Sequence, residues 1–131
     1  MKIYLASYLQ PENHGPGRKI AITDSKPDNI NVAGAWSFAI PDAELMQNYR
    51  AVQLKDQVQA KDLFVLGYES QLDNVFGSIK IDAQRDNKQP HELLPFTDGD
   101  TLLSWEREGY TNYRNILANY LRDIGVDVIL K

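Results

Sequence analysis

The 131-residue chain contains no cysteine. This absence excludes disulfide bonds, thiolate nucleophiles and zinc–thiolate sites together. Histidine is almost as scarce, because only His14 and His91 are present and neither has a second metal-ligating side chain two to four residues further along the chain. We therefore expect neither thiol redox chemistry nor a metal site.

The chain also lacks an excess of positive charge and any long apolar run. Its formal net charge of −4 gives no overall attraction to nucleic acid or to an anionic membrane. The first apolar run ends near Ser7, which is too short for a signal peptide, and no later run approaches the length of a membrane span. We expect no membrane association and a cytoplasmic location.

The common phosphate-binding loops are absent as well. The run Gly15-Pro16-Gly17 lacks the Gly-x-Gly-x-x-Gly spacing and the following helix that dinucleotide binding needs, and no Lys-Ser or Lys-Thr pair follows it to form a P-loop. The sequence predicts no cofactor.

The composition that remains is that of an ordinary globular protein, with 43% apolar and 24% charged residues. A chain of this length buries about two-thirds of its unfolded surface around a single core. No internal repeat or linker interrupts the pattern, so we predict one domain over residues 1–131.

Four apolar runs have the pattern of buried strands. They are Lys2 to Tyr8, Arg18 to Thr23, Thr101 to Trp105, and Val126 to Leu130. The segment from Trp36 to Ile40 fits either a short strand or an extended segment that is packed by its aromatic side chains.

Helical spacing of apolar residues predicts a helix from about Pro41 to Gln53, with the proline at the first helical position. Between Leu54 and Asn87 the apolar pattern fits either two helices or one bent helix, with Gly67 and Gly77 as the breaks. Pro90 to Leu94 is predicted to form one more helical turn.

The clearest helix lies in the last third of the chain. Six side chains recur at helical spacing there: Tyr113, Ile116, Leu117, Tyr120, Leu121 and Ile124. Gly125 follows at the C′ position. Strand, loop, helix and strand in this order predict a right-handed crossover between parallel strands. The fold is therefore predicted to be α/β, a single-domain sandwich with a mostly parallel central sheet and flanking helices.

The strand that ends in Leu102-Leu103-Ser104-Trp105-Glu106, with Asn112-Tyr113-Arg114 after it, resembles a motif of the family known as domain of unknown function 488. In that family a strand ending in Leu-Leu-Cys-Tyr-Glu precedes a charged loop, and Cys-His-Arg opens the next helix. The likeness continues through the run from Leu121 to Val128 and includes the first strand. It covers about a third of the chain.

Carried over position by position, the resemblance places the first family cysteine at Ser104, the glutamate at Glu106 and the second cysteine at Asn112. The family histidine falls on Tyr113 and the arginine on Arg114. Only the glutamate and the arginine are retained, so any family chemistry that needs a thiol, a metal or an imidazole base would be lost. The family has no settled activity to transfer.

The junction between the strand near Ser104 and the helix near Asn112 is the predicted site. Ligands of open α/β sheets bind at the carboxyl ends of strands, and a helix N-terminus attracts anions. Arg114 in the first turn is predicted to contact a phosphate or carboxylate, or else to pair with Glu106 and tie the loop to the helix. Asn112 and Tyr113, at the start of the helix, are predicted to bind the same ligand.

Glu106 follows the strand end, where a general base or nucleophile is expected, and a solvated loop glutamate is the alternative. Ser7 and Tyr8 are predicted to lie at the same sheet edge as Ser104 and to orient a ligand, provided the two strands are neighbours. His14 lies in a Gly/Pro loop beside Arg18 and Lys19, which fits a lid over an anionic ligand or simply an exposed polar loop.

The sequence is compatible with three functions. The first is a binding module for a small phosphate-bearing ligand related to nucleotides or nucleic acid. The second is a hydrolase or glycosyl-transfer enzyme using Glu106, because the run from Lys2 to Ser7 also looks like the first strand of nucleoside deoxyribosyltransferases. The third is a non-catalytic protein-interaction module. The oligomeric state is left open.

Overall fold

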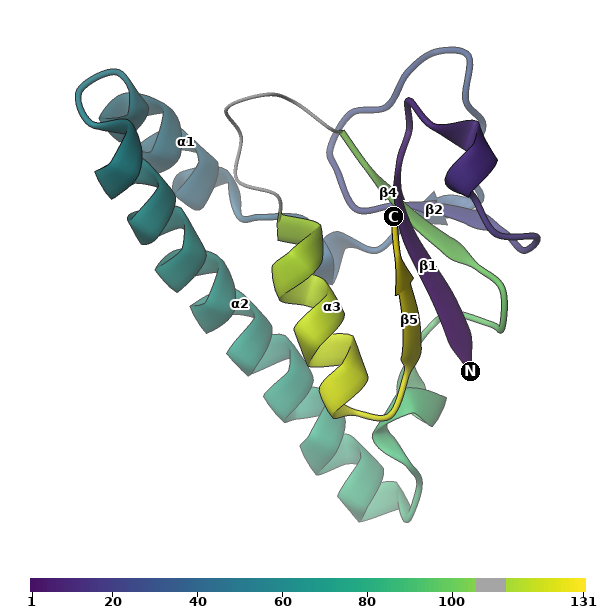
Figure 1. The fold of residues 1–131 in the computed structure, drawn as a ribbon. Coiled ribbons are helices and arrows are strands. Elements are labelled where there is room, and N and C mark those ends of the chain that lie inside the picture. Colours follow the sequence, from purple (N-terminus) through teal and green to yellow (C-terminus); the bar gives the residue numbers. More distant parts are fainter. Residues whose placement is uncertain (106–112) are drawn as a thin grey trace.

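The computed structural model describes residues 1–105 and 113–131. The chain has the predicted α/β fold, with a five-stranded sheet in the order β3-β2-β4-β1-β5 (Figure 1). All four strand pairings are parallel, where the sequence predicted a mostly parallel sheet. The bounds of the strands are β1 Lys2–Ser7, β2 Lys19–Ala21, β3 Gly34–Ala35, β4 Thr101–Ser104 and β5 Asp127–Leu130.

Strand β1 lies inside the sheet because its side chains are apolar on both faces. Leu5 and Ala6 point to opposite faces, and both are completely buried. β4 and β5 flank β1 and are not adjacent to each other. The strand, helix and strand of the last third therefore bracket the first strand of the chain.

Within the described residues, three α-helices and three 3₁₀ turns make up the rest of the regular structure. Their bounds are α1 Ala43–Gln53, α2 Gln57–Asp86 and α3 Tyr113–Asp123, with η1 Pro11–Asn13, η2 Ser37–Ala39 and η3 Pro90–Leu93. The predictions for α3 and η3 are confirmed. Gly125 has the positive φ of 93° expected of a glycine that ends a helix.

Of the two alternatives for the middle of the chain, the single helix holds: α2 has 30 residues and continues through Gly67 and Gly77, so neither glycine is a break. The lost backbone entropy of each glycine is outweighed by a buried stripe at helical spacing, Ala60, Phe64, Tyr68, Leu72 and Phe76. Gly67 also leaves room for α1, because a Cβ at this position would lie only 2.4 Å from Leu45 Cδ1.

Two smaller predictions are wrong. Pro41 precedes α1 and is not part of it, since Asp42 is the N-cap and the helix begins at Ala43. Neither alternative for the segment from Trp36 to Ile40 holds, because it forms the 3₁₀ turn η2. Trp36 is 6% exposed and packs edge-on against Phe96, with the ring centroids 4.8 Å apart. Burial of this indole holds the turn against the core.

The two faces of the sheet are covered differently. All three α-helices lie on one face (Figure 1), where Ile3, Leu5 and Leu102 join the large core that they form. On the other face a smaller core of Ala6, Tyr8, Ala21 and Leu103 is covered by loop residues. We call these the helix face and the loop face. No helix among the described residues is long and apolar enough to cross a membrane.

Candidate functional site

The predicted neighbourhood of Ser7 and Ser104 is confirmed. The two residues are direct partners in the parallel pairing of β1 with β4, at the carboxyl ends of both strands. Each is at most 1% exposed. Because side chains alternate along a strand, both serines share the helix face with Leu5 and Leu102. The sheet edge therefore places two buried hydroxyls side by side.

The hydrogen bonds of the two serines differ. Ser7 Oγ accepts a hydrogen bond from the backbone N–H of Leu9, at 3.1 Å, so it caps the turn that follows β1. Ser104 Oγ is shielded from solvent and has no hydrogen-bond partner among the described residues. Ser7 thus has a structural role. The burial of the Ser104 hydroxyl is not explained by any hydrogen bond among the described residues.

Arg114 does not have the exposure that an anion clamp needs. Its residue is 2% exposed, and its Nη1 donates to the backbone oxygen of Lys131 at 3.2 Å, just beyond β5. The first turn of α3 faces the sheet, so the guanidinium extends over the end of β5 and not outward to solvent. Contact of Arg114 with a phosphate or carboxylate stays a prediction, as does its pairing with Glu106, which lies outside the described residues.

Tyr113 belongs to the core of the helix face. Its ring packs against Phe64 and Tyr68, and its hydroxyl donates to the backbone oxygen of Ile22 at 2.7 Å. Burial raises the pKa of Tyr113 well above its usual range, which keeps the hydroxyl protonated as a donor. Tyr113 links α3 to the end of β2. Glu106 and Asn112, the remaining predicted site residues at this junction, lie outside the described residues.

Tyr8 points to the loop face, away from Ser7. The residue is 1% exposed. The Thr23 hydroxyl donates to the backbone oxygen of Ser25, so the 2.7 Å contact between Tyr8 Oη and Thr23 Oγ1 has Tyr8 as donor. Burial raises the pKa of Tyr8, which keeps the hydroxyl protonated as a donor. The predicted site residues thus divide between the two faces of the sheet.

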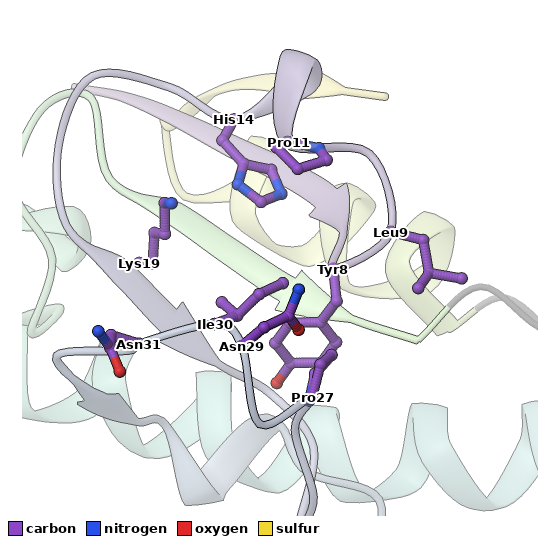
Figure 2. Close-up of a pocket in the computed structure, with 9 residues that line it drawn as sticks. All are labelled: Tyr8, Leu9, Pro11, His14, Lys19, Pro27, Asn29, Ile30 and Asn31. Carbon is purple, nitrogen blue, oxygen red and sulfur yellow. The ribbon is translucent and has the colours of Figure 1, made fainter.

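A pocket of about 450 Å³ lies over the loop face, between the loop that leads into β2 and the loop that leaves it (Figure 2). We call it the loop-face pocket. Nine residues line it: Tyr8, Leu9, Pro11, His14, Lys19, Pro27, Asn29, Ile30 and Asn31. Its volume is within the usual range of small-molecule sites, roughly 300–1,000 Å³. Of the residues predicted for the site, the pocket includes Tyr8.

The charge of the loop-face pocket is positive. Lys19 is its cationic lining residue, and none of the nine lining residues is an aspartate or glutamate. Within the described part of the chain, no carboxylate forms an ion pair with the Lys19 ammonium group. The strand geometry accounts for its position, since Lys19 opens β2 opposite Thr101 and shares the loop face with Ala21.

His14 is held in place by the end of β1. Its Nε2 lies 2.8 Å from the backbone oxygen of Ser7. A carbonyl oxygen only accepts, so Nε2 carries the proton. Nδ1 is shielded from solvent and has no partner among the described residues. The imidazole therefore forms a fixed wall of the pocket, and the loop, for which a lid and an exposed polar loop were the two alternatives, is attached to the sheet through His14.

Most of the pocket was not predicted from the sequence, because apart from Lys19 in β2 and Pro11 in η1 its residues lie outside helices and strands. The chain held one usable signal. The chain must return along the length of a strand before the next parallel strand can begin. Both connections around β2, residues 8–18 and 22–33, are rich in Pro, Gly and Asn and have no helical spacing. Two such loops beside one short strand predict walls on a face that no helix covers.

Among the described residues, no group of three or more His, Asp or Glu side chains is placed to hold a metal ion. Comparison with known proteins adds no relative: no family model, no curated protein and no solved structure matches the chain. The resemblance to domain of unknown function 488 therefore stays a prediction from the residues quoted for it.

Proposed function

We propose that this protein binds a small phosphate-bearing ligand in the loop-face pocket. The observation that carries the proposal is the Lys19 ammonium group in a pocket whose lining, among the described residues, contains no carboxylate. An anion placed there meets an unpaired positive charge and the side-chain amides of Asn29 and Asn31, which donate hydrogen bonds.

The pocket is also prepared for binding before a ligand arrives. Pro11 and Pro27 restrict the backbone of the two walls, and His14 is tied to β1 through Ser7. The opposite wall is braced by Lys26, whose Nζ donates to the backbone oxygen of Ile30 at 2.8 Å. A site whose walls are already ordered loses less conformational entropy when a ligand binds.

The test is to titrate the whole chain with inorganic phosphate and with pyrophosphate. Calorimetry measures the heat of binding, and thermal unfolding measures the change in melting temperature. A ligand that binds only the folded state raises the melting temperature by mass action. We expect pyrophosphate to raise it and Lys19→Gln to weaken binding at least tenfold. Lys55→Gln, in the exposed connection between α1 and α2, is the matched control and should bind as the parent does.

Two results would refute the proposal. One is the absence of any heat or melting shift with either anion at millimolar concentration. The other is equal binding by the parent and Lys19→Gln, with circular dichroism showing that both are folded.

A non-catalytic interaction module is the second candidate, and one feature favours it. The α1–α2 hairpin carries exposed apolar side chains, including Leu54 at 90%, Val58 at 72% and Leu66 at 65% exposure. Exposed apolar groups that lie together are typical of protein contact surfaces. If the partner is a different protein, the chain alone should not self-associate, and its sedimentation coefficient should not change with its concentration. Catalysis by Glu106 stays a prediction for a residue outside the described part.

A further inference from the structure

The loop-face pocket has two chemically different ends. Figure 2 shows Lys19 and Asn31 on one side of the hollow and Leu9 and Pro27 on the other. The first end offers a positive charge and an amide. The second is mainly apolar, and Leu9 is 60% exposed there. A ligand that is merely a small anion would leave the second end uncovered.

Two proline rings give the pocket rigid apolar surface. Pro11 and Pro27 come from the two opposing loops, and both rings hold their backbone in a fixed conformation. Ile30 lies between the two ends of the pocket (Figure 2). Rigid apolar side chains from two walls suit a planar ring, which gives up little conformational freedom when it enters.

The amides of the pocket suit a ring with hydrogen-bonding edges. A carboxamide presents both a donor and an acceptor, and asparagine pairs in this bidentate way with the edge of a nucleobase. Asn29 lies in front of Tyr8, near the apolar end, whereas Asn31 lies near Lys19 (Figure 2). A volume of about 450 Å³ exceeds what a phosphate group alone requires and leaves room for a sugar and a base.

Building on the proposed function, we propose that the ligand is a nucleoside monophosphate, with its phosphate at Lys19 and its base between Leu9 and Pro27. The loop-face pocket then recognises both parts of one molecule. The phosphate contributes charge attraction at the Lys19 end, and the base contributes burial of apolar surface at the Leu9 end.

The experiment compares four probes on the full chain by calorimetry: adenosine monophosphate, uridine monophosphate, ribose 5-phosphate and adenosine. Ribose 5-phosphate has the charge without the base, and adenosine has the base without the charge. We expect at least one of the two monophosphates to bind tenfold or more tightly than either of these partial ligands.

Variants separate the two ends of the pocket. Leu9→Ser should weaken the monophosphate at least threefold and leave ribose 5-phosphate unchanged. Leu66→Ser alters a leucine of similar exposure, 65% against 60%, on the α1–α2 hairpin and should change neither. Asn31→Asp places a carboxylate near Lys19 without changing side-chain size, and it should weaken every phosphate-bearing probe.

The two proposals fail in different ways. If ribose 5-phosphate binds as tightly as both monophosphates and Leu9→Ser has no effect, the inference about the base is wrong and the phosphate site stands. If none of the phosphate-bearing probes binds and pyrophosphate also fails, both proposals are refuted. Tighter binding of adenosine than of either monophosphate would likewise overturn both, because Lys19 would then have no role.

Discussion

Arg18 and Asp100 are joined twice, by the backbone and by the side chain. The backbone N–H of Arg18 donates to Asp100 Oδ1 at 2.8 Å, and its Nη2 donates to Oδ2, also at 2.8 Å. The carboxylate is 1% exposed, while the arginine side chain is half exposed. Thr97 donates its backbone N–H to the same carboxylate at 2.9 Å. This contact ties the start of β2, and with it the neighbouring Lys19, to the turn before β4.

We expect Asp100→Asn to lower the free energy of unfolding by about 1.5–3 kcal/mol, because hydrogen bonds to a buried charged group are lost or weakened. Asp123→Asn is the matched control. Asp123 pairs with Lys80 at 2.8 Å, but both side chains are more than half exposed, so its loss should cost about 0–1 kcal/mol. Urea unfolding of the three proteins measures both values. Equal costs would show that burial of Asp100 is unimportant.

The same carboxylate predicts a loss of stability in acid. Burial by itself would raise the pKa of Asp100, but the hydrogen bonds from Arg18 and Thr97 and the charge of Arg18 outweigh it and lower the pKa. A lowered folded-state pKa contributes stability that is complete above the unfolded value of about 3.9 and is lost as the pH falls through the folded value.

Urea unfolding at a series of pH values from 6 down to 2 tests this pH dependence. The difference in stability between the parent and Asp100→Asn should be constant near pH 6 and should shrink as the pH falls below about 4. A difference that stays the same down to the lowest pH would contradict the lowered pKa.

The two serines at the carboxyl ends of β1 and β4 should respond differently to the same substitution. Ser7→Ala removes the acceptor of the Leu9 N–H bond and should cost about 1 kcal/mol. Ser104→Ala removes a buried hydroxyl that has no partner among the described residues, so it should be neutral or stabilising. Thermal and urea unfolding of both variants decide the point. A cost at Ser104 as large as at Ser7 would reveal a partner for its hydroxyl.

The two glycines of α2 offer a third pair of variants. A Cβ at Gly77 would have no neighbouring atom within 4 Å, so Gly77→Ala should raise the free energy of unfolding by about 0.5–1 kcal/mol through helix propensity alone. Gly67→Ala should gain less, because Leu45 must move aside to make room. Calorimetric melting of both variants tests the order. A larger gain in unfolding free energy for Gly67→Ala than for Gly77→Ala would mean that α1 and α2 pack less closely around Gly67 than the structure shows.

Local patterns were enough for the elements whose structure depends on their own residues. The spacing from Tyr113 to Ile124 and the glycine at position 125 predicted α3 and its end, because helical periodicity and a positive φ are properties of neighbouring residues. The apolar run of β1 predicted a buried strand, and the neighbouring position of Ser7 and Ser104 followed once the strands were taken as adjacent and parallel.

Contacts between distant residues decided the rest. The continuity of α2 depends on a buried face that outweighs two glycines, and the burial of Arg114 depends on Lys131 at the far end of β5. The loop-face pocket exists because two loops without a repeating pattern cross the same face of the sheet and bring Leu9, Lys19 and Asn31 together. Such loops have no periodicity to read, since their conformation is set by the strands that they connect and by the surface over which they pass.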